Sequence, residues 1–192
     1  MLIAEPVSRA VRQAVPTFEP VSVAEAKKQC EIASGVRTHD DYFTELIAAA
    51  REQVEHDTGI VACTGSYVLK LDAWPDEDFI SIVERPLSSI TSIAYLDTDG
   101  ASQTWASANY AVDAARNVIW RAYNVSWPDT RADRNAITIT FVAGYATAAV
   151  VLERIKQAVQ IRVYAEFTNR GGAEEQRTYD RLIAGLARHS YP

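Results

Sequence analysis

The hydrophobic pattern of the chain changes its period twice. Over residues 23–33 and 41–58 apolar side chains recur at spacings of three and four, as on one face of a helix. From residue 66 to residue 143 apolar and polar residues alternate in short runs between Pro, Asp and Gly, and the helical spacing then returns over 149–168. This order predicts an α+β fold. We expect a bundle of N- and C-terminal helices, with a small antiparallel β subdomain inserted between them.

The ends of the predicted helices carry capping signals. Ser22 followed by Glu25 forms a capping box, in which the hydroxyl accepts from a helical N–H and the carboxylate accepts from the N–H of the cap. Asp40 or Asp41 is expected to cap the second helix, because an acid there satisfies unpaired N–H groups and complements the helix dipole. Gly59 is expected to end that helix in the left-handed conformation.

The region 66–143 contains several short segments of strand character. The clearest hairpin signal is the turn from Asp97 to Gly100, because Gly tolerates the positive φ of a tight connection. We expect these segments to form one small antiparallel sheet. The predicted strands cover 67–71, 79–83, 90–96, 109–112, 117–120 and 137–142.

The predicted helix at 149–168 is apolar over more than half of its circumference. A helix of this kind is normally buried on two sides, and we expect its second side to face a neighbouring subunit. One apolar stripe consists of Leu152, Ile155, Val159, Val163 and Phe167, and a second set consists of Val151, Ala158, Ile161 and Ala165.

Both ends of the chain differ from its centre. Residues 1–20 contain three prolines, which lack the backbone donor that helices and central strands use, and we interpret them as an extended N-terminal arm. Residues 21–170 form the main domain. Residues 171–192 follow a Gly-Gly pair and form a C-terminal tail with a short amphipathic helix. The apolar residues of that helix are Tyr179, Leu182, Ile183 and Leu186.

Composition narrows the class of protein. The net charge of −6 argues against a general nucleic-acid binder, which carries a basic patch to neutralise phosphates. A negative net charge suits the wall of a channel along which DNA slides, because it repels the phosphates. The same negative net charge is also ordinary for soluble cytoplasmic proteins. Cys30 and Cys63 are expected to be reduced core thiols. No run reaches the roughly 18 apolar residues of a membrane span, and no signal peptide is visible, so we expect a soluble, cytosolic protein.

Two fragments resemble parts of tyrosine phosphatases. Cys30 and Arg37 suggest a phosphate-binding loop, and Trp74-Pro75-Asp76 suggests a mobile acid. The spacing argues against this reading, because six residues separate Cys30 from Arg37, one more than the phosphatase loop holds. A second Trp-Pro-Asp at 127–129 indicates that the tripeptide serves as a turn. A phosphatase-like enzyme using Cys30 stays an alternative that we do not favour.

Metal and cofactor sites are not expected. His39, Asp40 and Asp41 begin the same predicted helix that His56 and Asp57 end, which separates the two groups by roughly 25 Å. Capping is therefore favoured over metal binding. The acids Asp72, Asp76, Glu77 and Asp78 lack the alternating ligands of a calcium loop and are interpreted as a solvated turn.

Four arginines lie near two tryptophans late in the β region. Stacking of Trp120 and Trp127 on single-stranded nucleic acid would need such basic neighbours. We favour salt bridges between subunits, and keep a nucleic-acid-binding module using the Arg116–Arg134 region as an alternative. The arginines are Arg116, Arg121, Arg131 and Arg134.

Several segments, taken in order, resemble the head–tail connector (adaptor) proteins of long-tailed bacteriophages and phage-derived particles. The resemblance covers roughly residues 17–187, and the loop 122–134 departs from it in length. Its C-terminal half rests on Phe141 to Tyr145, Ile155 to Val159, Tyr164 and Asn169-Arg170. Its N-terminal half rests on Val21 to Lys27, Asp40-Asp41, Leu46 to Glu55, Thr58-Gly59, Arg85 to Leu87, Ile90 to Ile93, Asp97 to Gly100, Tyr110 and Val112-Asp113.

The resemblance implies a structural virion protein without enzymatic activity, located in the neck between head and tail and made in the bacterial host cytoplasm. Such proteins form a ring of about twelve copies, and a ring needs a heterologous interface. The implied partners are further copies of the chain, a portal protein, and a head-completion or stopper protein on the tail side. Packaged DNA passes through the lumen without sequence-specific binding, and no membrane is involved.

We assign candidate contacts within this picture. The expected subunit interface uses Arg51, Glu55, Ile161, Arg162 and Ala165. The tail from residue 171 onward is the expected portal-facing extension, with Tyr179, Leu182, Ile183 and Leu186 as its contact residues. Chain ends that order only on docking would delay assembly until the portal is present.

Overall fold

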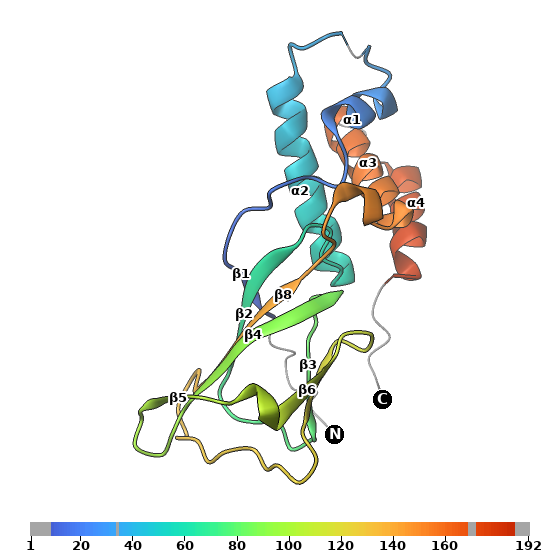
Figure 1. The fold of residues 1–192 in the computed structure, drawn as a ribbon. Helices are drawn as coiled ribbons and strands as arrows, with labels where there is room; N and C mark the ends of the chain where they lie inside the picture. Colours follow the sequence, from blue (N-terminus) through green and yellow to red (C-terminus); the bar gives the residue numbers. More distant parts are fainter. Residues whose placement is uncertain (1–8, 34, 169–171, 187–192) are drawn as a thin grey trace. The chain divides into compact units, whose positions relative to one another are not determined.

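The computed structural model describes residues 9–33, 35–168 and 172–186, and it divides into two compact units. The β unit comprises 1–15 and 65–144, and the helical unit comprises 16–64 and 145–192. One unit is built of strands and the other of helices (Figure 1). The predicted α+β class is therefore confirmed.

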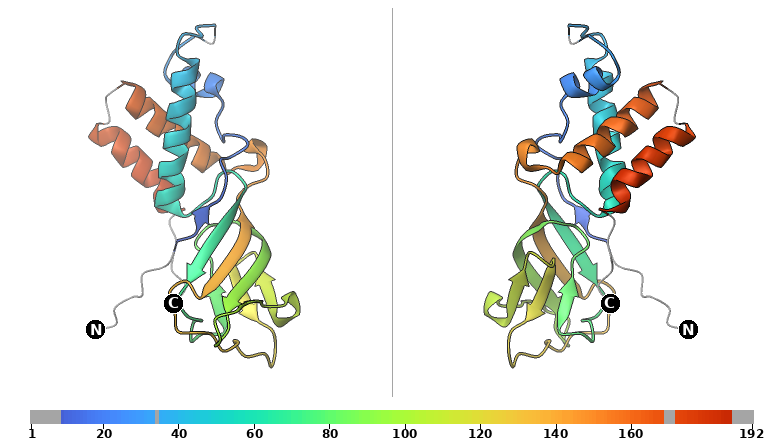
Figure 2. Two further views of the ribbon diagram at one scale, coloured as in Figure 1. Left: turned by 90° about the vertical axis from the view of Figure 1, so that its left-hand side faces the viewer. Right: turned by 90° about the vertical axis from the view of Figure 1, so that its right-hand side faces the viewer.

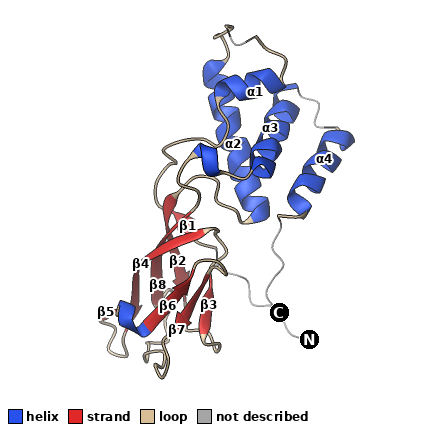
Figure 3. Ribbon diagram, turned by 45° about the vertical axis from the view of Figure 1, so that its right-hand side comes forward, coloured by secondary structure: helices blue, strands red, loops and turns tan. Residues whose placement is uncertain are grey.

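In its described part the β unit forms two antiparallel sheets rather than the single sheet that we expected (Figure 3). Alternation identifies strands but does not encode which strands pair, so it could not separate the two sheets. The five-stranded sheet has the order β1 (Val11–Arg12), β2 (Gly65–Leu71), β8 (Ile137–Ala143), β4 (Leu87–Leu96), β5 (Ser102–Thr104). The three-stranded sheet has the order β3 (Phe79–Ser81), β7 (Val118–Arg121), β6 (Tyr110–Asp113), with a short 3₁₀ turn, Ser107–Asn109, before β6.

Strand β8 is the centre of the larger sheet. Its odd-numbered residues from Ile137 to Ala143 are buried and its even-numbered residues are partly exposed, which is the period of a strand with one covered face. The hairpin between β4 and β5 has the predicted turn. Asp97 accepts hydrogen bonds from the N–H groups of Asp99 and Ala101, and Gly100 adopts φ 84°.

The described part of the predicted N-terminal arm is extended but not free. Val11 and Arg12 form β1 and pair with Val68 and Tyr67 of β2. The Arg12 Nε donates to the Tyr67 hydroxyl at 2.7 Å. Residues 1–8, the first part of the predicted arm, lie outside the described residues.

The described residues of the helical unit form four α-helices that share one core (Figures 1 and 2). Helix α3 packs against each of the other three. The helices are α1 (Val23–Gln29), α2 (Asp40–Thr58), α3 (Glu153–Thr168) and α4 (Ala173–Ala184), and a 3₁₀ turn, Ala148–Val150, precedes α3. The largest fully buried side chains of this core are Val21, Phe43, Ile47, Val54, Ile155 and Val159.

Two predicted helices are shorter than the apolar pattern suggested. Helix α1 ends at Gln29 instead of residue 33, because Cys30 is its C-cap and Glu31 takes a left-handed φ of 58°. Helix α3 begins at Glu153 instead of residue 149, since the 3₁₀ turn and an extended Val151 precede it. Apolar spacing continues past helix ends into segments that are buried without being helical.

The capping predictions had different outcomes. The Ser22–Glu25 capping box is present, with the Ser22 N–H donating to the Glu25 carboxylate at 2.7 Å. The prediction that Asp40 or Asp41 caps α2 was wrong. The N-cap is His39 and makes no side-chain cap bond, while the Asp40 carboxylate pairs with the buried Lys27 ammonium. Both acids lie in the first turn, where they still complement the helix dipole.

Replacement of Gly59 tests the end of α2. Gly59 takes φ 68° at the C-cap, and its N–H donates to the Glu55 carbonyl. We expect Gly59→Ala to lower the free energy of unfolding by about 1 kcal/mol, because a Cβ disfavours the left-handed conformation. Urea unfolding followed by circular dichroism measures this change.

Gly35→Ala is the matched control for that substitution. Gly35 has no heavy atom within 4 Å of an added Cβ. We therefore expect Gly35→Ala to leave the unfolding midpoint unchanged or to raise it slightly. Equal destabilisation by the two substitutions would contradict the role given to Gly59.

Candidate functional site

Arg51 and Glu55, two of the predicted interface residues, form an ion network inside the helical unit. Arg51 is 2% exposed, and its guanidinium lies 2.8 Å from the Glu19 carboxylate and 3.0 Å from that of Glu55. The other Glu55 oxygen accepts from the Ala62 N–H at 2.8 Å. The network thus joins α2 to the segment before α1 and to the loop after α2. This burial argues against a contact between Arg51 and a neighbouring subunit.

The charge of Arg51 is held by its partners. Burial on its own lowers the pKa of Arg51, but the carboxylates of Glu55 and Glu19 outweigh it and raise the pKa above its ordinary value. The guanidinium therefore stays protonated at every pH at which the protein folds. A buried charge is tolerated only when it is paired, so Glu19 and Glu55 are structural requirements of the helical unit.

The second apolar face of α3 is covered within the same chain. Ala158 and Ala165 are 0% and 6% exposed, and α4 packs against α3. Ile161 packs on the core while it stays partly exposed. Much of this face is therefore covered within one chain. A pattern of apolar residues does not specify whether the covering surface belongs to the same chain, and the expected contact of this face with a neighbouring subunit stays a prediction. Of the predicted interface residues on α3, Ile161 and Arg162 keep partly exposed side chains.

Helix α4, predicted as part of a tail, is docked on the helical unit. Tyr179 is 2% exposed, and its hydroxyl donates to Asp57 at the end of α2 at 2.6 Å. The guanidinium of Arg162 lies over the Tyr179 ring, 5.3 Å from its centroid. A partner could reach the Tyr179 side chain only if α4 moved. The other predicted portal-facing residues, Leu182, Ile183 and Leu186, pack against the core and are half-buried, while residues 169–171 and 187–192 of the predicted tail region lie outside the described residues.

The Tyr179–Asp57 bond changes the pKa of both groups. Burial and the hydrogen bond to Asp57 raise the pKa of Tyr179. Burial of Asp57 on its own raises its pKa, but hydrogen bonds from Gln53, Tyr179 and His56 outweigh burial and lower it. Asp57 is therefore ionised at neutral pH and acts as an acceptor for the tyrosine hydroxyl.

Two exposed apolar pairs on the helical unit were not among the predicted sites. Val150 and Leu152 are 56% and 43% exposed and flank the buried Val151. We had placed Leu152 on the buried stripe of the helix, but it directly precedes α3 and its side chain is exposed. The sequence signal that could have identified this surface is the absence of charge from residue 142 to residue 152. Val36 and Tyr42, near the start of α2, are 42% and 46% exposed.

The predicted arginine cluster is paired within the β unit. Arg121 pairs with Asp78, Arg116 lies 3.7 Å from Asp113, and Arg131 lies 3.8 Å from Asp133. We had favoured salt bridges between subunits for this cluster, and the structure instead places these three within one chain. The pairing also weakens the nucleic-acid alternative, because each of these cations already has an acidic partner.

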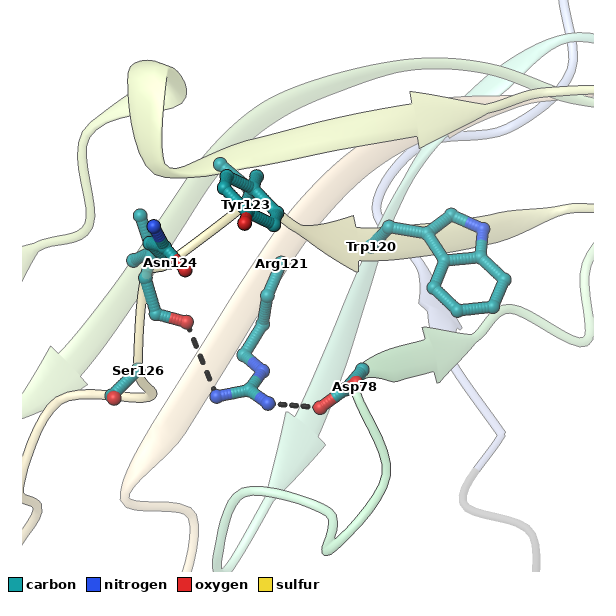
Figure 4. A pocket seen from close by; sticks show the side chains of 8 residues that line it. Asp78, Trp120, Arg121, Tyr123, Asn124 and Ser126 are labelled. Atoms are coloured by element: carbon teal, nitrogen blue, oxygen red, sulfur yellow. Dashed lines mark hydrogen bonds and ion pairs between the residues drawn. The ribbon is translucent and has the colours of Figure 1, made fainter.

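An open pocket of about 810 Å³ lies at the end of strand β7 (Figure 4). Trp120 and Tyr123 lie on its two sides, and the Arg121–Asp78 pair lies between them. The turn that carries Tyr123 extends from Ala122 to Val125, and Asn124 takes a left-handed φ of 59°. Sequence reasoning identified Trp120 and Arg121 but missed Tyr123, whose side chain is 93% exposed.

The fragments that resemble a phosphatase do not form a phosphatase site. Burial raises the pKa of the Cys30 thiol, whereas a nucleophilic cysteine needs a lowered pKa. The two Trp-Pro-Asp turns pack against each other, with the rings of Trp74 and Trp127 stacked at 4.8 Å. Trp74 and Trp127 therefore serve to hold the loop 122–134 against the β unit. Cys30 and Cys63 are both present as thiols, as expected, with Cys63 buried and Cys30 partly exposed.

Over residues 9–33, 35–168 and 172–186, no three His, Cys, Asp or Glu side chains converge as metal ligands. Within the same ranges, no helix has the length and apolar character needed to cross a bilayer. His39 contributes to ring packing, with its centroid 6.5 Å from that of Phe167.

Comparisons with known proteins find solved structures that have the same fold as this chain. No protein-family model and no curated protein sequence matches the chain. Solved structures do match. A chain from the neck of an empty GTA particle computed with C6 symmetry has a TM-score of 0.79 at 19% identity, covering 95% of this chain and 97% of that chain. A chain from the neck of a native GTA particle computed with C12 symmetry has a TM-score of 0.76 at 19% identity, with the same coverage.

A third similar chain comes from the virion of a native gene transfer agent (GTA) particle. It has a TM-score of 0.78 at 20% identity, and the match again covers 95% of this chain and 97% of that one. At this level of identity the likeness establishes a shared fold over nearly the whole length of both chains. It does not by itself transfer a function.

Removal of the Tyr179 hydroxyl tests the docking of α4. We expect Tyr179→Phe to lower the free energy of unfolding by about 1.5 kcal/mol at neutral pH, because the hydroxyl donates to an ionised carboxylate. Tyr123→Phe is the matched control, since the Tyr123 side chain is 93% exposed, and we expect it to have no effect. Chemical denaturation of the three proteins measures both changes.

The difference in the free energy of unfolding between wild type and Tyr179→Phe depends on pH. Asp57 has a lowered pKa in the folded protein, so its contribution to stability is complete above its unfolded-state pKa and is lost as the pH falls through the folded-state value. The difference between wild type and Tyr179→Phe should therefore narrow below about pH 4. A difference that stays constant from pH 7 to pH 3 would contradict the assignment of Asp57 as the acceptor.

Proposed function

We propose that this chain is a structural protein of the neck of a phage or phage-derived particle. In this proposal it is a ring-forming head–tail adaptor that docks to the portal and links the DNA-filled head to the tail-completion proteins. The observation that carries the proposal is the full-length match of its fold to chains from the neck of GTA particles, with TM-scores of 0.76 and 0.79. The order of the segments that resemble phage connector proteins supports it independently.

A closed ring is the arrangement that we propose for its copies. The two similar neck structures were computed with C6 and C12 symmetry, which supports a ring of about twelve subunits. Each subunit of a ring meets its neighbours through two different surfaces. The exposed apolar pairs Val150–Leu152 and Val36–Tyr42 are candidates for these surfaces, because exposed apolar side chains gain most from burial in an assembly.

The helical unit is the part to which we assign portal contact. It combines helices from the N- and C-terminal segments of the chain. Leu182 and Ile183 of α4, and Leu186 in the turn after α4, keep partly exposed side chains. The stopper protein would bind on the tail side. Packaged DNA would pass through the lumen without sequence-specific contacts, and the net charge of −6 suits a wall that does not retain it. Its place would be the neck of the particle, after synthesis in the host cytoplasm.

Light scattering of the purified chain, alone and mixed with candidate portal rings, tests the proposal. We expect either a multimer of about twelve subunits or a monomer that joins the portal ring. The double variant Val150→Asp, Leu152→Asp should lose this association, because it places charge on the proposed contact surface. Val15→Asp, at a side chain that is 89% exposed, is the control and should assemble as wild type does.

A monomer that ignores every portal ring tested would contradict the proposed function. Loss of assembly in both the double variant and the Val15→Asp control would contradict only the assignment of the contact surface. Circular dichroism of each variant establishes that the fold is intact before assembly is measured.

A further inference from the structure

The outward face of α2 carries a row of acids. Asp41, Glu45 and Glu52 are exposed, and their spacings of four and seven residues place them within about 40° of one another around the helix axis. The one lysine or arginine of α2 is Arg51, which is buried. Among the described residues Asp41 and Glu45 have no ion pair, while Glu52 lies 3.4 Å from Arg51. We call these three acids the acidic row.

A row of arginines lies along α4 and ends at the start of α3. Arg177 and Arg181 are exposed and one helical turn apart, on the face of α4 opposite the buried Tyr179. The exposed Arg154 continues the row, because a Cβ added to Gly185 would lie 2.7 Å from its guanidinium. None of the three arginines has an ion pair with another residue that the structure describes. We call Arg154, Arg177 and Arg181 the basic row.

The acids near the basic row have other contacts. Glu153 pairs with Lys156 at 2.9 Å, and the Asp180 carboxylate accepts from the Gln176 side chain at 2.7 Å. Two further acids lie in the first turn of α4, where they complement the helix dipole. The positive charge of the basic row is therefore available to a partner.

The two rows lie on opposite sides of the helical unit. Helix α2 is nearest to the viewer in the left view of Figure 2, and α4 is nearest in the right view. An exposed apolar side chain accompanies each row, because Tyr42 follows Asp41 and Leu152 lies two residues before Arg154. Each side of the unit thus combines apolar surface with charge, and the two sides carry charge of opposite sign.

We propose that the acidic row of one copy of this chain contacts the basic row of the next copy. A head-to-tail contact needs two different surfaces on each subunit, and the two rows are complementary surfaces of this kind. At 1.5 Å per residue, the acidic row spans about 16 Å of helix and the basic row, from Arg177 to Gly185, spans about 12 Å. Opposite charges fix the register of such a contact, and the apolar side chains beside them become buried.

This inference rests on the proposed ring and names the two surfaces through which its copies would meet. It also excludes a symmetric dimer through either row, since two acidic rows or two basic rows repel each other. The contact should weaken as the salt concentration rises, because exposed charges are screened.

Charge reversal tests the contact. One double variant is Asp41→Lys, Glu45→Lys, and the other is Arg177→Glu, Arg181→Glu. Each should weaken self-association by about tenfold or more, because like charges then face each other between copies. Analytical ultracentrifugation of the full chain over a range of concentrations measures this change. If wild type assembles only on portal rings, the number of copies bound to each ring is compared instead.

An equal mixture of the two double variants should assemble again. In an alternating assembly every reversed acidic row meets a reversed basic row, and every unchanged row meets an unchanged one. A variant that had merely failed to fold could not be rescued in this way. The control is Asp76→Lys, Asp99→Lys, which makes the same change of net charge at two exposed acids of the β unit and should assemble as wild type does.

Other results would overturn the inference. A mixture that stays dissociated would show that the two rows do not meet, and equal weakening in the control would show that only net charge matters. Loss of assembly in the Arg177→Glu, Arg181→Glu variant alone would assign the arginines to another partner, such as the phosphates of DNA.

The inference and the proposed function can fail separately. Copies that bind portal rings without any rescue in the mixture would refute the contact and leave the adaptor proposal standing. Rescue of assembly in a chain that ignores every portal ring would support the contact and refute the adaptor proposal.

Discussion

The contact between α2 and α3 is the constraint on which the helical unit depends. In the sequence the two helices lie on either side of residues 65–144, the larger part of the β unit, yet Phe43 and Val54 of α2 share one buried cluster with Val159 of α3. Loss of a buried aromatic side chain of this kind costs about 3 to 5 kcal/mol, a large part of the stability of an ordinary domain. The chain can therefore form its helical unit only by bringing both of its halves together, and α1 and α4 then complete the same core.

Buried polar contacts fix the details of that core. Arg51 ties α2 to the segment before α1 through Glu19, and Tyr179 ties α4 to the end of α2 through Asp57. Both contacts end on a carboxylate. Hydrogen bonds and ion pairs are directional, whereas apolar packing is not, so these contacts fix how the helices are oriented in the core. The residues that first suggested subunit contacts are thus largely those that hold one subunit together. If the chain assembles as we propose, the contact surfaces are left to exposed apolar residues such as Val150 and Leu152.

The sequence contained enough information for the helices and for most of the strands, but not for β1 and β5 and not for how the strands and helices pair. Spacing identified all four helices, the Ser22–Glu25 capping box, the Gly59 stop and the Asp97 turn, because each depends on residues close together in the chain. It did not identify the two separate sheets, the covering of α3 by α4 or the pairing of Arg121 with Asp78, which depend on residues distant in sequence. Tyr123 gave no signal because an exposed residue in a turn has no periodicity.

The most direct test of the account counts copies of this chain in the particle that carries it. Tagged particles would be purified from producing cells, and quantitative mass spectrometry would compare this chain with the portal protein. A neck ring predicts a ratio of about one copy of this chain to each portal subunit, retained after the tail is removed. Absence of the chain from DNA-filled particles, or a ratio far below one, would contradict the proposal that it is an adaptor.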